Sequence, residues 1–251
     1  QDMPFPSTAC LVQERLGAWN AAAFDMQAGC TGFIYAASVA EKFLLSPAYN
    51  NILVIGAEVL SPIIDYTDRS TCVIFGDGAG AVVMGKGSDE RYGFLESYLG
   101  ADGRGAMQVY MLGGGTAHPA SHETVDKGLH YIRMNGQEVF KFATVTIEKV
   151  ANRLLEKAGL SFNDVDLFIP HQANIRIIQA AMRRMNIGPE KTMINIDRYG
   201  NTSAGTVPIA LAEAYLEGRL KPGSLILMIA FGAGLTYGGI LMRWGCDGIA
   251  L

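Results

Sequence analysis

The sequence predicts a layered α/β protein made of two similar halves, and three observations support this. Hydrophobic residues make up 49% and charged residues 18% of the 251 residues, which is typical of a tightly packed α/β enzyme. Apolar runs of strand length alternate with runs of helix length, which favours a mostly parallel sheet. A weak internal repeat aligns AFDMQAGC (23–30) with NIDRYGNT (195–202), and the same offset aligns VAEKFL (39–44) with LAEAYL (211–216).

The first elements follow from local patterns. Residues 7–16 form a short amphipathic pattern that stops at a glycine, which predicts a helix. The apolar run 21–26 predicts a buried strand. Residues 30–45 are apolar, rich in small side chains and followed by Ser-Pro, which predicts a helix that ends there. The run ILVIG at 52–56 predicts a buried strand of the parallel type.

The middle of the chain holds a strand pair, a loop and a long helix. Residues 71–75 and 79–84 are apolar and flank GDGAG, so they are expected to pair as strands around a tight connection. Residues 100–130 carry glycines, polar residues and three of the four histidines, which indicates a long loop. Residues 137–157 have an apolar stripe at helical spacing and predict a helix.

Strand-like and helix-like runs alternate along the rest of the chain. Strands are expected at 165–169 and 193–196, and helices at 174–185 and 206–216. The stretch FGAGLTYGG then separates two further apolar runs, which predicts a second strand pair. These last two strands are expected at 225–230 and 238–243.

Charge and hydropathy exclude several classes of function. The net charge of −4 gives no global basic field that would hold nucleic acid or an anionic membrane. Apolar runs are too short for a membrane span and the start does not resemble a signal peptide, so we expect a soluble, cytoplasmic protein. The chain opens at Gln1 and its first element is already a helix, so we expect it to be the remainder of a longer protein.

The cysteine pattern does not predict a metal site. None of the four cysteines forms a CxxC pair or lies at zinc-finger spacing from a histidine, and HPASH (118–122) lacks the glutamate of the zinc motif HExxH. Cys10 and Cys72 lie in apolar runs and are expected to be buried small hydrophobes. Cys246 lies in a polar tail and is expected to be incidental.

Cys30 differs from these three because it lies at a turn that leads into a helix. Unpaired backbone N–H groups and the positive end of the helix dipole at such a turn favour the thiolate and lower the thiol pKa. The flanking Gly29 and Gly32 let the backbone turn sharply and let a substrate approach. A buried structural cysteine is the alternative, but the position favours a nucleophile.

His171 and Asn201 are the candidate partners of Cys30. His171, in FIPHQAN, follows a hydrophobic strand at its C-terminal end, where ligand sites of parallel sheets lie. Asn201, in RYGNTSAG, occupies the turn of the second half that matches the Cys30 turn of the first. A satisfied core histidine and a helix N-cap are the structural alternatives for these two residues.

The order Cys, His, Asn also describes papain-like peptidases, and His171 follows Cys30 at a spacing that this family shows. Spacing alone therefore does not decide whether the chain is such a peptidase or another enzyme with a cysteine nucleophile. The residues around Cys30 argue against a peptidase, because Cys30 is followed by Thr-Gly-Phe in place of the peptidase CGSCW context. The caspase signature is interrupted by Gly29, and its histidine precedes the cysteine.

At these residues the chain resembles the β-ketoacyl-[acyl carrier protein] synthase III family, the thiolase-fold enzymes that start bacterial fatty-acid synthesis. The matching stretches run through nearly all of the chain, and PHQAN together with GNTSAG is highly specific. The other stretches are FPSTAC, FDMQAGCTGF, DRSTCVIFGDGAGA, NGQEVFKFA and AFGAGLTYGG. The resemblance implies a five-layered α-β-α-β-α fold of two similar halves, with the first half incomplete because its initial strand–helix–strand segment is missing.

The implied reaction is a decarboxylating Claisen condensation of a short acyl-CoA with malonyl-acyl carrier protein. Cys30 would hold the acyl group as a thioester. His171 and Asn201 would stabilise the enolate formed as carbon dioxide leaves. Backbone N–H groups of Cys30 and Ala233 would form the oxyanion hole. Elongating synthases use a Cys-His-His triad, and thiolases use a second catalytic cysteine. Asn201 therefore distinguishes this chain from both classes.

The resemblance also implies substrate contacts. Arg69, in YTDRST, matches an arginine that contacts the nucleotide of coenzyme A, and Gly136 and Gln137, in NGQEVFKFA, are assigned to the same ligand. Phe5 matches the aromatic residue that caps the acyl pocket across a homodimer interface, where it favours short primers. Phe231 matches a residue beside that pocket. No cofactor is implied, because coenzyme A arrives as the thioester substrate.

A cationic helix face suggests where the carrier protein binds. At 100° per residue, the helix after His171 carries its apolar residues on one face and its arginines on or beside the opposite face. A solvated face is the alternative reading. The family docks its acidic carrier protein here. The residues assigned to this surface are Gln172, Ala173, Asn174, Ile175, Arg176, Arg183, Arg184 and Lys141.

These observations predict a homodimeric thiolase-fold acyltransferase. Its first half is expected over residues 1–99, a connecting loop region near the acyl pocket over 100–135, and the second half over 136–251. Two alternatives stay open: a related thiolase-fold acyltransferase or starter-type polyketide synthase, and an inactive structural fragment. The identity of the primer, acetyl or branched short acyl, does not follow from the sequence.

Overall fold

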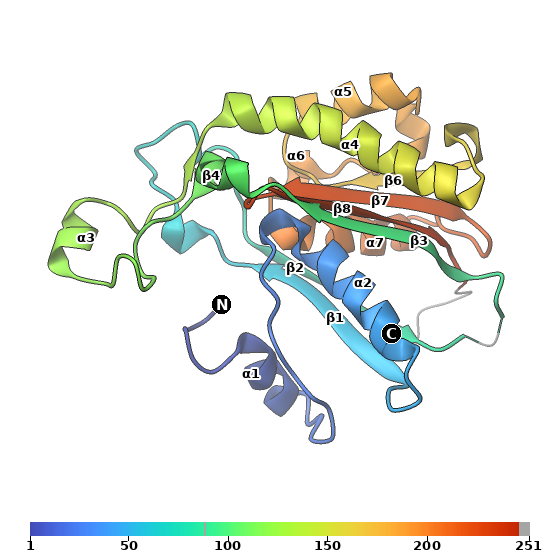
Figure 1. The fold of residues 1–251 in the computed structure, drawn as a ribbon, viewed down its shortest axis with the longest axis horizontal. Helices are drawn as coiled ribbons and strands as arrows, with labels where there is room; N and C mark the ends of the chain where they lie inside the picture. Colours follow the sequence, from blue (N-terminus) through green and yellow to red (C-terminus); the bar gives the residue numbers. More distant parts are fainter. Residues whose placement is uncertain (88, 246–251) are drawn as a thin grey trace.

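A four-stranded sheet forms the centre of the molecule. The structure is a computed structural model, and it describes residues 1–87 and 89–245. The strand order is β3, β8, β7, β6 (Figure 1), in which β6 runs parallel to β7 and the other neighbours are antiparallel. All eight residues of β7 are buried, because helices cover both faces of the sheet. The strands are β3 (Gly93–Ala101), β6 (Leu167–Pro170), β7 (Leu225–Gly232) and β8 (Thr236–Arg243).

Helices α4 (Gly136–Ala158) and α5 (Ile175–Met185) cover one face of this sheet, and α2 (Gly32–Leu44) and α7 (Thr206–Leu216) cover the other (Figure 1). The long α4 has clear start and stop signals: the Asn135 side chain accepts a hydrogen bond from the Glu138 N–H, and Gly159 ends the helix in the left-handed conformation. The helices thus form separate layers on each side of the sheet.

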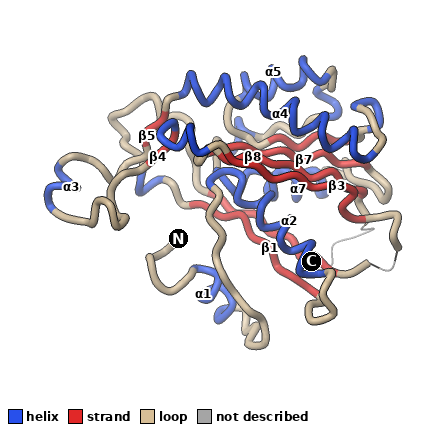
Figure 2. The backbone as a smooth tube through the Cα atoms, in the orientation of Figure 1, coloured by secondary structure: helices blue, strands red, loops and turns tan. Residues whose placement is uncertain are grey.

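A second, two-stranded sheet lies on the far side of α2 and α7. It pairs β1 (Asn51–Glu58) with β2 (Gly78–Gly85) in antiparallel register. Helix α1 (Thr8–Arg15) lies outside it, and a long loop (tan in Figure 2) leads from α1 to α2. Short elements complete the described chain: α3 (His122–Asp126), α6 (Ile196–Tyr199), β4 (Val109–Tyr110), β5 (Arg133–Met134) and the 3₁₀ turns η2 (Ser61–Ile63), η3 (Gly103–Gln108), η4 (Phe162–Asp164) and η5 (Pro189–Lys191).

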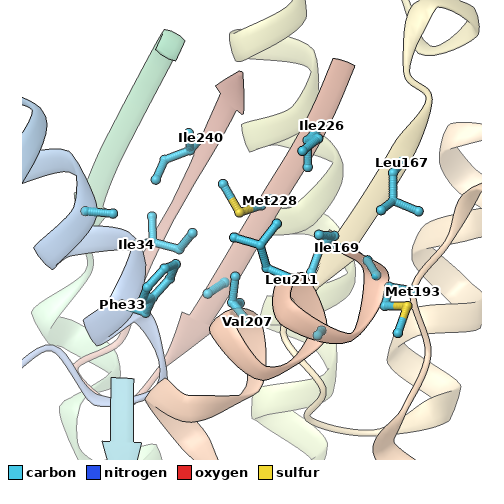
Figure 3. Packing of buried hydrophobic residues seen from close by; sticks show 14 of the residues in the cluster. Phe33, Ile34, Leu167, Ile169, Met193, Val207, Leu211, Ile226, Met228 and Ile240 are labelled. Atoms are coloured by element: carbon cyan, nitrogen blue, oxygen red, sulfur yellow. The ribbon is translucent and has the colours of Figure 1, made fainter. Parts of the chain in front are cut away.

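The main core fills the space between the large sheet on one side and helices α2 and α7 on the other. Figure 3 shows Phe33 and Ile34 of α2 and Leu211 of α7 packed toward Met228 of β7 and Ile240 of β8. All five are almost inaccessible to solvent. Each buried side chain of this size stabilises the fold by about 1.5–3 kcal/mol, so this layer fixes how the two helices sit on the sheet.

The internal repeat is visible as a repeated order of elements. The 3₁₀ turn η1 (Gly29–Thr31), α2 and the pair β1–β2 have the same order as the turn η6 (Ser203–Gly205), α7 and the pair β7–β8. Each turn packs against a strand of the other half, η1 on β7 and η6 on β1. The domain boundaries stay predictions. Strand β3 pairs along its length with β8 and so joins the sheet that also contains β7 and β6.

Several predicted strands are wrong. Residues 21–26 are part of a loop and not a strand, since most of them are exposed and no neighbouring strand pairs with them in the described structure. Residues 71–74 form turns, and β2 pairs with β1 instead. Residues 193–195 have no regular structure, and α6 begins directly after them. The sheets are mostly antiparallel because short turns connect strands such as β7 and β8.

Two cysteine expectations also need correction. Cys10 is exposed, because α1 buries none of its residues, and Cys72 is only half-buried. Cys246 lies outside the described residues. Among the described helices, none combines the length and apolar character that a membrane crossing requires.

Candidate active site

Cys30 lies in the middle of η1, at the turn that leads into α2. Gly29 precedes it in the left-handed conformation (φ +52°), and a Cβ there would come within 3.2 Å of the Ala233 nitrogen. A Cβ on Gly232 would meet the Cys30 nitrogen at 2.8 Å. The two glycines therefore let the β7–β8 turn pack directly against the cysteine backbone.

Cys30 is half-buried, and the surroundings of its thiol differ from the predicted ones. Burial raises its pKa to about 11, although hydrogen bonds from the Ser203 side chain and from the Cys30 and Ala233 backbone N–H groups lower it, and the Glu58 charge raises it further. The expectation of a lowered pKa at the helix N-terminus is therefore wrong for this thiol. The cost of desolvating the thiolate outweighs the backbone N–H groups, so the resting group is a thiol.

His171 follows β6 and is only 1% exposed. Its backbone N–H donates to the Ile229 carbonyl oxygen at 2.8 Å, and its Nδ1 lies 2.7 Å from the Thr206 hydroxyl. The Phe231 ring meets the imidazole edge to face, with the ring centroids 5.3 Å apart. Burial lowers the imidazole pKa to about 3, so His171 is neutral at pH 7 and offers one N–H donor.

Asn201 is fixed by both its backbone and its side chain. Its N–H donates to the Ile74 carbonyl oxygen at 2.9 Å, and its carbonyl oxygen accepts from the Gly76 N–H at 3.0 Å. The side-chain oxygen accepts the Ser203 N–H at 2.8 Å. Because this bond occupies the amide oxygen, the NH₂ group of the buried side chain is left to act as the donor.

Ser203 links the surroundings of the three predicted residues. It adopts a left-handed backbone (φ 50°), which is unusual for a residue other than glycine. Its backbone N–H donates to the Asn201 side-chain oxygen, and its hydroxyl donates to Glu58 at 3.0 Å. The same hydroxyl also interacts with the Cys30 thiol and lowers its pKa. Its carbonyl oxygen lies 3.0 Å from the Thr206 hydroxyl that contacts His171. The structure thus brings Cys30, His171 and Asn201 to one buried site through their shared neighbours.

Sequence reasoning missed Glu58, Ser203 and Thr206. Ser203 and Thr206 lie within or next to the GNTSAG stretch, but serine and threonine before a helix are ordinary capping residues. Glu58 follows the ILVIG strand as an ordinary charged residue after an apolar run. In the structure, burial raises the pKa of its carboxyl, against hydrogen bonds from Ser203 and from the Ala204 N–H.

The predicted pocket residues lie in very different places. Phe231 is buried against His171, whereas Phe5 is 88% exposed. Arg69, Gly136 and Gln137 are exposed. Among the residues that the structure describes, no cluster of three or more His, Cys, Asp or Glu side chains could hold a metal ion.

The predicted cationic face of α5 is present. Ile178, Ala181 and Met185 are buried, while Arg176 and Arg183 are exposed. Two other basic residues of this region are engaged in ion pairs: Lys141 with Glu138 at 2.7 Å, and Arg184 with Glu148 at 2.6 Å.

The segment before α5 is less open than expected. Gln172 is 1% exposed, and its side chain donates to the Pro170 and Met193 carbonyl oxygens and accepts the Asn195 N–H. It therefore ties the end of β6 to the α6 region, and its side chain does not face a partner as expected. The other residues assigned to this stretch are Ala173, the helix N-cap Asn174 and the partly exposed Ile175.

Two family models match the chain in its two halves. The model described as "3-Oxoacyl-[acyl-carrier-protein (ACP)] synthase III" matches residues 24–103, and the model of the C terminal part of the same family matches residues 155–244. Both ranges include predicted site residues, Cys30 in the first and His171 and Asn201 in the second.

Similar proteins carry the same description. A β-ketoacyl-[acyl-carrier-protein] synthase III of Syntrophomonas wolfei is 63% identical over 98% of this chain and 74% of its own length. That of Caldanaerobacter subterraneus is 56% identical over 97% of this chain and 73% of its own. The crystal structure of 3-oxoacyl-[acyl-carrier-protein] synthase III from Aquifex aeolicus superposes with a TM-score of 0.87 at 48% identity, covering 96% of this chain and 73% of that one.

Proposed function

This chain belongs to the 3-oxoacyl-[acyl-carrier-protein] synthase III family, and from that membership we propose that it condenses a short acyl-CoA primer with malonyl-acyl carrier protein. The product is a β-ketoacyl-acyl carrier protein, the starting point of fatty-acid synthesis. The family and the thiolase-like fold predicted from the sequence are confirmed. The observation that best supports the reaction is one buried site that holds a thiol, a neutral histidine and an asparagine whose NH₂ is free to donate.

Cys30 is the proposed nucleophile of the first half-reaction. Its sulfur attacks the carbonyl carbon of the acyl-CoA, and the carbon–sulfur bond to coenzyme A breaks. The thiol proton passes to the Ser203 oxygen while the Ser203 proton passes to Glu58, along the hydrogen bonds that connect these groups. Glu58 then returns a proton to the departing thiolate of coenzyme A, so the acyl-enzyme forms with no net gain or loss of protons.

His171 and Asn201 act in the second half-reaction. The thioester carbonyl oxygen of the malonyl group accepts hydrogen bonds from the imidazole N–H and the amide NH₂. As carbon dioxide leaves, the electrons of the broken carbon–carbon bond form an enolate on this oxygen. A neutral imidazole suits the role because an imidazolium would readily protonate the enolate, and burial keeps His171 neutral.

The enolate carbon then attacks the carbonyl carbon of acyl-Cys30. The oxyanion that forms is held by the Cys30 and Ala233 backbone N–H groups, a role supported by the hydrogen bonds through which both groups lower the pKa of the Cys30 thiol. When this intermediate collapses, the bond to the Cys30 sulfur breaks, and the thiolate takes up a proton to restore the resting thiol.

The substrate and partner surfaces follow the family. Arg69, Gly136 and Gln137 are exposed and available to coenzyme A. Phe231 lines the acyl pocket, and the exposed Phe5 reaches the pocket of a second copy in a cytoplasmic homodimer. No cofactor takes part beyond the coenzyme A of the substrate.

The carrier protein docks on the exposed basic face of α5. Arg176 and Arg183 supply positive charge that attracts an acidic partner. An open groove of ≈ 510 Å³ at Arg183, lined also by Met182 and Ile187, adds an apolar contact.

The test is intact-protein mass after incubation with acetyl-CoA, for this chain and for Cys30→Ala. An acetyl adduct on the parent alone, discharged by malonyl-acyl carrier protein with formation of the β-ketoacyl product, supports the proposal. A folded parent that stays unmodified with a panel of short acyl-CoAs overturns it and favours the inactive fragment. Discharge to a different product favours the polyketide-type alternative.

A further inference from the structure

Thr206 is the only polar side chain in the described structure that contacts the inner nitrogen of His171. Its hydroxyl lies 2.7 Å from Nδ1, and both residues are almost fully buried. The same hydroxyl lies 3.0 Å from the Ser203 carbonyl oxygen. A hydroxyl has a single proton, so it donates either to the histidine nitrogen or to the carbonyl oxygen, and this choice has a chemical consequence.

The direction of this hydrogen bond decides which imidazole tautomer is present. If Thr206 donates to the Ser203 carbonyl, Nδ1 must carry the proton and donate to Thr206, and Nε2 presents a lone pair. If Thr206 donates to Nδ1, Nε2 carries the proton and becomes a donor. Because burial keeps the imidazole neutral, only one of these two tautomers is present at a time.

The surroundings favour donation to the histidine. The Ser203 carbonyl oxygen already accepts the Thr206 backbone N–H at the start of α7, so it keeps a partner when the hydroxyl turns away. Nδ1 of His171 has no such second partner in the part of the chain that the structure describes. A buried nitrogen without a partner is costly, so the hydroxyl proton is better used on Nδ1.

We propose that Thr206 is a positioning residue: it donates its hydroxyl proton to His171 Nδ1 and thereby holds the imidazole as the Nε2–H tautomer. This tautomer is the form that donates a hydrogen bond to the thioester oxygen during decarboxylation. The inference rests on the proposed function, since it concerns how His171 is prepared for that step. Ser203 orients Asn201 in the same way, so the η6–α7 junction presents both side chains as donors.

The wild-type protein gives the first test. The chain has only four histidines, so a ¹⁵N-histidine-labelled sample yields few imidazole signals, and His171→Ala identifies the one of interest. Nitrogen–hydrogen correlation spectra report directly which ring nitrogen carries the proton. A protonated Nε2 with an unprotonated Nδ1 supports the proposal, and a protonated Nδ1 overturns it whatever the variants do.

Two variants test the role in catalysis. Thr206→Val has nearly the same shape but no hydroxyl, and we expect it to lose the fixed tautomer. We expect malonyl decarboxylation to slow by about 10- to 100-fold, the loss found when the hydrogen-bond partner of a metal-binding histidine is removed. Thr206→Ser keeps the donor and should retain the wild-type tautomer and most of the rate. Acetyl transfer to Cys30 should change far less in both variants, because it does not use the Nε2–H donor.

The outcomes separate this proposal from the proposed function. Wild-type protein that forms no acyl-Cys30 and no product contradicts the proposed function, while the tautomer measurement still stands. Active wild-type protein together with Thr206→Val of unchanged tautomer and decarboxylation rate overturns the role of Thr206. If Thr206→Val does not fold, the wild-type spectrum and the comparison with Thr206→Ser decide.

Discussion

Cys30 is expected to react slowly with alkylating reagents at neutral pH, although it is the proposed nucleophile. Its pKa of about 11 leaves about one molecule in a thousand as thiolate at pH 8, whereas a thiol at the ordinary value of 9.0 has about one in ten. The alkylation rate should therefore be about 100-fold below that of an unperturbed thiol. It should then rise about tenfold per pH unit until the pH reaches the pKa.

Alkylation by iodoacetamide, followed by mass spectrometry of the Cys30 peptide, measures this profile. The exposed Cys10 in the same sample provides an unburied thiol for comparison. A Cys30 profile that levels off below pH 9 would contradict the argument that burial outweighs the backbone N–H groups. The proposed reaction tolerates such a high pKa because Ser203 and Glu58 remove the proton as the sulfur attacks.

Glu58→Gln gives two effects of opposite sign. Loss of the negative charge lowers the Cys30 pKa, so alkylation at a fixed pH should become faster, although the thiol should stay slow because burial raises the pKa more than the Glu58 charge does. Acetyl transfer from acetyl-CoA should become slower, since the proton acceptor is gone. Glu156→Gln, an exposed change of equal charge on α4, should alter neither rate. Acceleration of both reactions in Glu58→Gln would show that Glu58 acts only through its charge.

Three further predictions concern stability, packing and docking. The pKa of His171 in the folded protein, about 3, lies below its usual 6.5, so its contribution to stability is complete above pH 6.5 and falls by about 1.4 kcal/mol per pH unit toward pH 3. In urea unfolding from pH 7 to 5, the free energy of unfolding should therefore decrease less steeply in His171→Asn than in wild type. Gly232→Ala places a Cβ 2.7 Å from the Cys30 Cβ, so it should destabilise the fold by about 1–3 kcal/mol in thermal unfolding and block acetylation. Charge reversal at Arg176 and Arg183 should raise the KM for malonyl-acyl carrier protein and leave acetyl transfer unchanged.

Matched controls make these results specific. A Cβ on Gly103 would meet no atom within 4 Å, so Gly103→Ala should leave stability and acetylation near wild type. Arg15→Glu changes the same charge on α1, on the opposite side of the molecule from α5 (Figure 1), and should leave the KM for the carrier protein unchanged. Equal pH slopes for His171→Asn and wild type would mean that other groups cause the acid sensitivity.

Sequence patterns predicted the helices better than the strands. The helices at 137–157 and 206–216 have long periodic patterns or clear end signals, and α4 and α7 occupy nearly the same residues. The predicted strand 21–26 failed because a short apolar run says nothing about a neighbouring strand with which it pairs. Strand β3 was missed because its pairing with β8 depends on residues far away in the sequence.

The candidate site was likewise predicted only in part from the sequence. Cys30, His171 and Asn201 were selected as candidates because each lies at a turn between a strand-like and a helix-like run, and Asn201 also because its turn matches that of Cys30. The resemblance gave them roles that stay predictions. Their electrostatics could not be predicted in this way. The thiol pKa depends on burial between η1, η6 and the β7–β8 turn, which are distant in the sequence, and local reasoning about the helix N-terminus gave the wrong sign.

The repeated architecture explains why the donors and the thiol come from different halves. The turn η1 of the first half carries Cys30 and packs on β7, whereas η6 of the second half packs on β1 and brings Ser203 to Glu58 at the end of that strand. A Cβ on Gly56 of β1 would meet the Ala204 carbonyl oxygen at 2.2 Å, and one on Gly232 of β7 would meet the Cys30 nitrogen at 2.8 Å.

Glycines at related places in the two halves therefore set how closely the turns approach. A change that separates the halves would move the thiol away from the groups that orient His171 and Asn201, even if each half kept its own fold. Substitutions at Gly56 and Gly232 should accordingly reduce acetylation and condensation together, whereas Thr206→Val, which leaves this contact unchanged, should reduce condensation far more than acetylation. Different ratios of the two losses would show whether a residue holds the halves together or prepares the chemistry.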